Sequence, residues 1–148
     1  MKKLICFIIC TTLLAAMTIP ATAAEQDSLC SRTVTFLDND ITITEEITIL
    51  SNSRSADKVG QKKATVTRSG ETIAIIVIQA TFRYDGSSVS VISKSVTQKT
   101  TYNGWNYSQN SFTSSGGTVT LNAKLTKLLV LTQNVTVSLT CDKNGNLS

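Results

Sequence analysis

An uninterrupted run of six apolar residues at positions 73–78 (IAIIVI) constrains the fold of this chain more than any other feature. A short apolar run of this kind is typical of a strand that is covered on both faces, although a buried helical segment could also contain it. The β-branched side chains favour the strand, and so does the Asp85-Gly86 pair that follows, because Asp-Gly supplies the positive φ angles of a type I′ hairpin turn. We therefore predict a long central strand that turns at Asp85-Gly86 into a second strand over residues 89–96.

Residues 1–24 have the pattern of a secretory signal peptide. A basic start (KK) precedes an apolar segment over residues 4–16, and the small residues that follow predict cleavage after Ala23 or Ala24. The apolar segment is shorter than the roughly 20 residues of a membrane-spanning helix, so a retained anchor is the weaker alternative. We therefore expect a secreted, extracellular chain of residues 25–148 that forms a single domain and is not stably inserted in a membrane.

Signal cleavage leaves two of the four cysteines, Cys30 and Cys141, near opposite ends of the mature chain. In an oxidising extracellular compartment, two cysteines that are flanked by strand-like sequence usually pair. We predict a disulfide that joins the first strand to the last. Two unpaired or metal-binding thiols are the alternative, which the neighbouring sequence does not support.

Alternation of apolar and polar residues, the pattern of a strand with one buried face, recurs along most of the mature chain. Glu45 falls on the isoleucine face of one such segment, which predicts a bulge or an edge position there. A polar stretch at 51–61 is predicted to be a surface loop, Asn103-Gly104 a second hairpin turn, and residues 128–131 the connection to the last strand. Residues 98–102 are predicted to continue the strand at 89–96 or to restart it. The predicted strands lie at residues 32–37, 41–49, 62–68, 72–84, 89–96, 105–112, 119–125 and 135–141.

These short, regularly spaced strands, about eight in number and with almost no helical periodicity between them, predict an all-β fold. We expect an antiparallel two-layer β-sandwich of immunoglobulin-like type, with its termini joined by the disulfide. The usual immunoglobulin bridge joins facing internal strands, so the label refers to architecture alone. A closed barrel is the alternative.

The residue types present argue against catalysis. The chain has no histidine, which removes Ser-His-Asp and Cys-His arrangements together with the commonest metal ligand. Residues 142–146 match the start of a calcium loop but lack its later glycine and glutamate, so we interpret them as a turn in a polar tail. We expect no enzyme activity, no cofactor and no metal.

The charge also limits the possible partners. The formal net charge of +4 falls when the two signal lysines are removed, and the remaining bases are scattered along the chain. Nucleic acid and anionic membrane surfaces are therefore not expected partners.

The aromatic group Tyr102, Trp105 and Tyr107 is the strongest candidate for a binding site. Trp105 and Tyr107 are predicted to share one strand face, with Tyr102 across the turn, and exposed rings beside amides suit stacking on sugars or docking of a peptide. For Trp105 itself a position in the core of the sandwich is favoured over an exposed one. An arrangement with Trp105 buried and the tyrosines outside is also open.

We therefore expect a monomeric secreted interaction module for a glycan, a cell-wall polymer or a protein. A secreted antagonist or membrane-active factor, and a structural subunit that assembles by strand addition at an open edge, are the alternatives.

Three parts of the sequence carry a resemblance: residues 80–86 (ATFRYDG), Trp105, and the ending at residues 139–148 (LTCDKNGNLS). Together they resemble a group of small, uncharacterised secreted proteins of Gram-positive gut and soil bacteria, over roughly residues 64–148. The resemblance implies a secreted bacterial β-sandwich. It implies no activity and assigns no functional residues.

Overall fold

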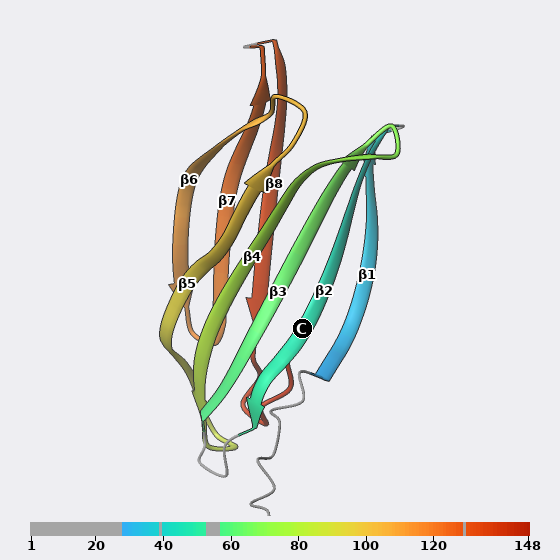
Figure 1. The fold of residues 1–148 in the computed structure, drawn as a ribbon. Coiled ribbons are helices and arrows are strands. Elements are labelled where there is room, and N and C mark those ends of the chain that lie inside the picture. The colour runs from blue at the N-terminus through green and yellow to red at the C-terminus, as the bar shows by residue number, and fades with distance from the viewer. Residues whose placement is uncertain (1–27, 39, 53–56, 129) are drawn as a thin grey trace, which may run out of the picture.

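The computed structural model describes residues 28–38, 40–52, 57–128 and 130–148. The predicted signal peptide, residues 1–24, lies outside these ranges. Within them the chain forms eight strands in two antiparallel sheets, which confirms the all-β prediction (Figure 1). The strands are β1 (Ser28–Asp38), β2 (Ile41–Asn52), β3 (Asp57–Arg68), β4 (Glu71–Tyr84), β5 (Val89–Thr101), β6 (Asn106–Ser115), β7 (Thr118–Lys127) and β8 (Leu131–Thr140).

Each sheet is a meander in which every strand pairs with its neighbour in sequence. The larger sheet has the order β1-β2-β3-β4-β5 and the smaller one the order β6-β7-β8. An immunoglobulin sandwich connects its strands as a Greek key, so the likeness here is limited to two stacked antiparallel sheets. No pairing between described strands joins the two sheets into a closed barrel.

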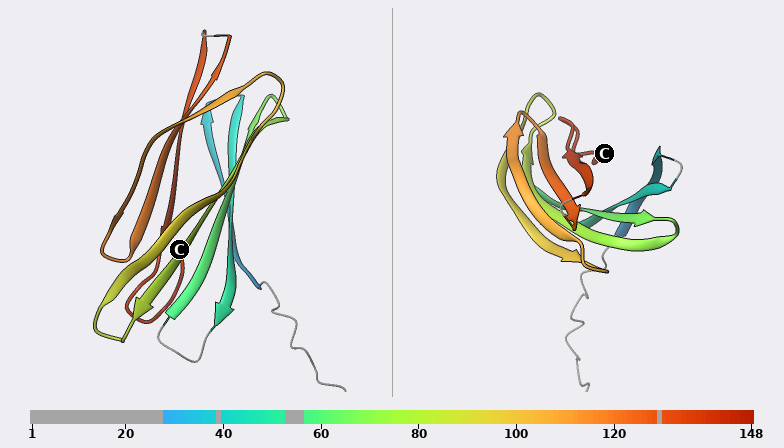
Figure 2. Two further views of the ribbon diagram at one scale, coloured as in Figure 1. Left: turned by 60° about the vertical axis from the view of Figure 1, so that its left-hand side comes forward. Right: turned by 90° about the horizontal axis from the view of Figure 1, so that it is seen from above.

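The smaller sheet covers only part of the larger one. Strands β3, β4 and β5 approach the smaller sheet, whereas β1 approaches only β2 among the described strands. Seen from above, the larger sheet curves around the smaller one (Figure 2). Strands β1 and β2 therefore extend beyond the edge that β8 forms.

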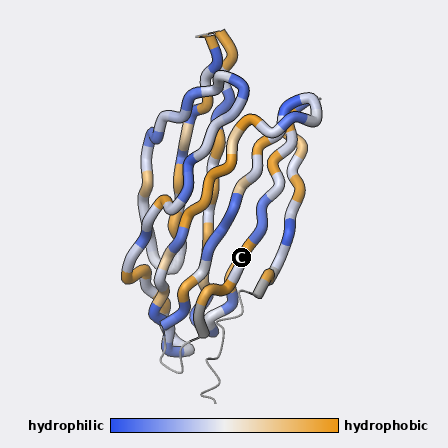
Figure 3. The backbone as a smooth tube through the Cα atoms, viewed as in Figure 1, coloured by the Kyte–Doolittle hydropathy of each residue, from blue (hydrophilic) through white to orange (hydrophobic). Residues whose placement is uncertain are grey.

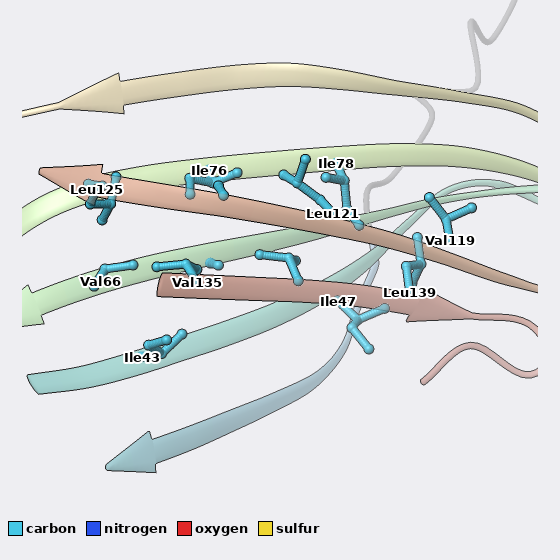
Figure 4. Packing of buried hydrophobic residues seen from close by; sticks show 14 of the residues in the cluster. Ile43, Ile47, Val66, Ile76, Ile78, Val119, Leu121, Leu125, Val135 and Leu139 are labelled. Atoms are coloured by element: carbon cyan, nitrogen blue, oxygen red, sulfur yellow. The ribbon is translucent and has the colours of Figure 1, made fainter. Parts of the chain in front are cut away.

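The core lies between the sheets and is built from alternate residues of the facing strands, as the period of two requires. Figure 4 shows how side chains from β2, β3 and β4 meet those of β7 and β8. The labelled core residues are Ile43, Ile47, Val66, Ile76, Ile78, Val119, Leu121, Leu125, Val135 and Leu139.

The apolar run at 73–78 forms the most buried strand, β4, but only one of its faces packs against the other sheet. Ala74, Ile76 and Ile78 belong to the core cluster. Val77 points to the opposite face, where it is buried without joining that cluster. The prediction of a strand is confirmed, and the prediction of cover on both faces is wrong because no second layer lies on the outer side of the sheet in the described residues.

Strand β2 ends at Asn52 and β3 begins at Asp57, so the predicted loop over 51–61 is wrong for residues 51–52 and 57–61, and residues 53–56 lie outside the described residues. This half of β3 pairs with the far end of β4, from Gln79 to Arg83. Gly60 leaves room there for Leu147, because a Cβ at this position would lie 2.5 Å from a methyl group of that side chain and would force it to shift. Residues 57–61 are predicted to be a loop because they are mostly polar and include a glycine. In the structure they form a strand that the C-terminal turn covers.

The chain turns at both predicted positions. The turn at Asp85-Gly86 is longer than expected, and the turn at Asn103-Gly104 connects strands of different sheets. The loop after β4 has four residues, and the Asp85 carboxylate accepts hydrogen bonds from the Ser87 and Ser88 amides at 2.8 and 2.7 Å. The Asn103-Gly104 turn has positive φ at both residues. It does not form a hairpin, because β5 and β6 belong to different sheets and the turn carries the chain from one to the other.

Candidate functional site

The structure does not gather the three predicted aromatic residues on one exposed face. Trp105 is 5% exposed and belongs to the core cluster, which confirms the interpretation that it fills the core. Tyr102 is 40% exposed and lies just before the crossing turn, across which its carbonyl accepts a hydrogen bond from the Trp105 amide at 3.0 Å. A cavity of about 240 Å³ lies at this end of the sandwich, and Trp105 forms part of its wall with Glu71 and Lys127.

Tyr107 points inward rather than toward a ligand. It pairs across the sheet with Leu125, which is fully buried, and the two side chains therefore share the core face. The Tyr107 hydroxyl is buried and has no hydrogen-bond partner among the described residues. Burial raises the pKa of this phenol above its ordinary value. The Lys99 ammonium lies 5.9 Å from the centre of the ring and helps to cover it.

The edge strand β1 is a more accessible surface than the aromatic group. Its outer edge pairs with no described strand, and its exposed large apolar side chains include Val34, Leu37 and Phe36, the last of which is 77% exposed. Natural edge strands are usually protected by lysine, proline, inward-pointing charges or β-bulges, and in β1 the irregular positions lie near its two ends. The sequence of β1, SLCSRTVTFLD, contains neither lysine nor proline.

The register assigns the side chains of β1 to two faces. Val34 and Phe36 pair with Thr44 and Thr42, so they lie on the outer face of the larger sheet. Thr35 pairs with the core residue Ile43 and lies on the inner face.

A groove runs along the inner side of β1 and β2, opposite β8. Its volume is about 290 Å³. The lining mixes apolar side chains with hydroxyl, amide and carboxylate groups, which suits a ligand with both backbone-like polar groups and apolar side chains. The lining residues are Thr35, Leu37, Ile43, Glu45, Asn134 and Thr136.

Glu45 and Lys62 form the main charged contact beside this groove. The Lys62 ammonium lies 3.3 Å from the Glu45 carboxylate and donates to the Ser138 carbonyl at 2.6 Å, so it joins β2 and β3 to β8. The register of β2 is continuous through Glu45 in both of its pairings, so the predicted bulge does not form there, and the predicted edge position is wrong too because β2 lies between β1 and β3. Its carboxylate reaches the groove because β2 lies next to the edge strand.

The C-terminal residues form an ordered turn. The Asp142 carboxylate accepts hydrogen bonds from the amides of Asn144 and Asn146, each at 2.8 Å. The Asn146 bonds hold the pKa of Asp142 below its ordinary value. Leu147 forms a backbone bridge with Cys141, which confirms a turn but shows that this segment packs onto the sandwich. In the part of the chain that the structure describes, no three His, Cys, Asp or Glu side chains cluster as a metal site.

The two cysteines of the predicted disulfide can be placed only in part. Cys141 is buried directly after β8. Cys30 belongs to β1, but its side chain lies outside the described residues, so the disulfide stays a prediction. Figure 1 shows that β1 begins and β8 ends at the same end of the sandwich.

Comparison of the chain with protein-family models, with curated proteins and with solved structures finds no match. The resemblance to secreted Gram-positive proteins therefore stays a prediction. The described residues contain no helix with the length and apolar character that a membrane span requires.

The exposure of β1 is a feature that sequence reasoning missed. Its alternation is the same as that of a strand inside a sheet, because period two reports which side chains share a face and not whether a further strand pairs with the edge. The one available signal was the position of this strand at the start of the predicted series, where only one sequence neighbour can pair with it in a meander.

Proposed function

We propose that this protein is a secreted interaction module that binds an extended segment of a partner protein by adding it to edge strand β1. The observation that carries the proposal is the edge of β1, which no described strand pairs, with exposed Val34, Phe36 and Leu37 and a groove beside it. In strand addition the backbone hydrogen bonds supply affinity, and alternate side chains supply specificity.

The two faces of β1 offer different contacts to an added strand. Side chains on the inner face of that strand would meet Leu37 and the polar lining of the groove, including Asn134 and Thr136. Side chains on the outer face would cover Val34 and Phe36. The ligand that fits both is a peptide with apolar residues at alternate positions. We propose that the protein is immunoglobulin-like in this limited sense: it stacks two antiparallel sheets and offers one sheet edge to a partner.

We propose that the module is a monomer without its partner. The pairing of β1 with β2 is irregular between Leu29 and Ser31 and again between Phe36 and Asp38. These irregularities leave the edge regular only from Ser31 to Phe36. That length is enough for a short peptide, whereas it limits the pairing of two whole edges.

The experiment is a selection of peptides from a phage-displayed library against the mature chain, followed by hydrogen exchange on the complex. We expect every second backbone amide of residues 31–37, the ones that point away from β2, to become protected when a selected peptide binds. The variant Val34→Lys/Phe36→Lys should lose binding, since it places charges on the edge without touching the core. Ile92→Lys is the matched control, because Ile92 is also an exposed apolar residue of the larger sheet, on β5.

Failure to select any peptide would count against the proposal. So would a peptide that binds the Val34→Lys/Phe36→Lys variant as well as the original chain, or one that leaves exchange in β1 unchanged.

A further inference from the structure

The connection between β7 and β8 projects from the sandwich and carries exposed apolar side chains. Leu128 is 81% exposed and Val130 is 82% exposed, and Leu131 follows them at the start of β8. We call these three residues the apolar tip. Figure 1 shows the β7–β8 hairpin extending beyond the other loops at that end, and Figure 3 shows its hydrophobic colouring.

The apolar tip contributes little to the stability of the folded chain. The Val130 amide donates to the Lys127 carbonyl at 3.3 Å and closes the turn. Leu128 adopts a φ of 53°, a left-handed conformation that glycine or asparagine adopts at lower cost than leucine. Leucine therefore supplies neither the best turn nor buried surface at this position. Its apolar surface gains free energy only when something outside the chain covers it.

Charge is segregated in the half of the chain that carries the tip. Between residues 86 and 141 the sequence contains four lysines and no Asp or Glu. Two of the lysines, Lys124 and Lys127, lie on the end of β7 that leads to the apolar tip. Lys127 directly precedes Leu128, and Lys124 lies roughly 13 Å behind Leu128 along the strand, at about 3.3 Å per residue.

We propose that the apolar tip enters the interface of an anionic lipid bilayer and docks the protein on it peripherally. An interfacial segment buries its apolar side chains about 5–10 Å into the headgroup and acyl boundary. With the tip at that depth, Lys124 and Lys127 lie at the level of the headgroup phosphates, where a lysine is attracted to anionic lipid.

The shape of the tip favours a bilayer over a protein groove. Leu128 and Val130 are each exposed over most of their surface, so a partner must surround the tip to cover both. A lipid surface adapts to such a projection, whereas a protein needs a matching cavity.

The acidic residues at this end of the sandwich offset the attraction to anionic lipid only in part. Asp40 is paired with Arg68 at 2.7 Å, and Arg68 lines the same cavity as Lys127. Glu71 lines that cavity too, and it accepts a hydrogen bond from Asn103. Asp40 and Arg68 therefore offset each other, and Glu71, whose hydrogen-bond donor is a neutral amide, offsets only one of the two lysines Lys124 and Lys127.

This proposal is independent of strand addition at β1, because it uses a different sheet and a different part of the molecule. The experiment is flotation of the mature chain with vesicles of pure phosphatidylglycerol and, separately, of pure phosphatidylcholine. We expect flotation with phosphatidylglycerol that weakens as salt is raised. The variant Leu128→Asn/Val130→Ser should bind at least about tenfold more weakly, with an unchanged melting temperature, because it removes exposed apolar surface and keeps a residue suited to the turn.

Two further variants separate the contributions. Lys124→Gln/Lys127→Gln should lose the preference for phosphatidylglycerol. Ile92→Ser, which removes an exposed apolar side chain elsewhere, should float as the original chain does. The proposal is overturned if the chain floats with neither vesicle, or if the Leu128→Asn/Val130→Ser variant floats equally well. It is also overturned if the tip instead holds two copies together, which sedimentation would show as a dimer that this variant converts to a monomer.

Discussion

Tyr107 is the residue whose polar group is least suited to its surroundings. Its hydroxyl is buried without a hydrogen-bond partner in the described residues, while its ring packs against the core. An unpaired buried hydroxyl loses its hydrogen bonds to water and gains none in return.

We therefore expect Tyr107→Phe to make the protein more stable, by about 1 kcal/mol, because it removes the unpaired group and keeps the ring. Urea denaturation near neutral pH measures the difference. A less stable Phe variant would show that the hydroxyl has a partner in solution.

The same substitution has a pH dependence with a definite sign. Burial raises the pKa of Tyr107 in the folded chain above its ordinary value of 10.0. The folded state with a neutral phenol therefore keeps its full stability below that ordinary value and loses stability as the pH rises through the folded-state pKa, since the unfolded chain ionises first. The advantage of the Phe variant should widen over this alkaline range, which urea denaturation at a series of pH values would measure.

At the scale of elements, Lys62 is a cross-link between the two sheets. It joins Glu45 of β2 to the backbone of β8 from its own position on β3, in a mostly buried site. Removing one partner of such a contact leaves a carboxylate and a carbonyl without their donor.

We expect Lys62→Met, which keeps the length of the side chain, to destabilise the protein by about 1–3 kcal/mol. Lys63→Met is the matched control. Lys63 pairs with Glu46 on the exposed outer face, also at 3.3 Å, and an exposed pair contributes at most about 1 kcal/mol. Equal losses in the two variants, measured by urea denaturation, would contradict the cross-link.

The elements themselves could be predicted from the sequence, but their assignment to sheets could not. Alternation located β7 and β8, because their buried residues occur at every second position. The Asn103-Gly104 pair predicted a tight turn correctly, since positive φ is a local preference. Whether that turn joins paired strands or crosses between sheets depends on contacts far apart in sequence, and no local pattern reports them.

The candidate sites were missed for a related reason. Phe36 and Leu128 are ordinary strand and connection residues in the sequence, and only the assembled fold shows that neither is covered. The charge segregation is visible in the sequence, but the net charge hides it. The net charge sums the first half of the chain, where most acids lie, with the segment over residues 86–141, whose charged residues are all basic. Trp105 was interpreted correctly as a core residue because a lone tryptophan in a sandwich has a large apolar surface to bury.

At the scale of the whole molecule, the proposed Cys30–Cys141 disulfide would tie the edge strand to the end of the strand that faces the groove. We expect Cys30→Ser to lower the stability by about 4 to 5 kcal/mol, less any strain in the native bridge, because the bridge closes a loop of most of the chain. Cys30 is the residue to change, since Cys141 is buried and its substitution would disturb the core as well.

The measurement is thermal unfolding of the original chain with and without a reducing agent, next to the Cys30→Ser variant. Reduction should lower the melting temperature of the original chain to that of the variant. A melting temperature that reduction leaves unchanged would refute the bridge.

The meander order of both sheets has a consequence for how the chain folds. Each strand finds its partner next to it in sequence, across connections as short as Ser69-Gly70 and Gly116-Gly117. The pairing steps therefore involve little loop-closure entropy, and only the stacking of the two sheets brings distant residues together. A chain of this kind can assemble hairpin by hairpin from its first strand onward, so the larger sheet can be complete before the smaller one closes over it.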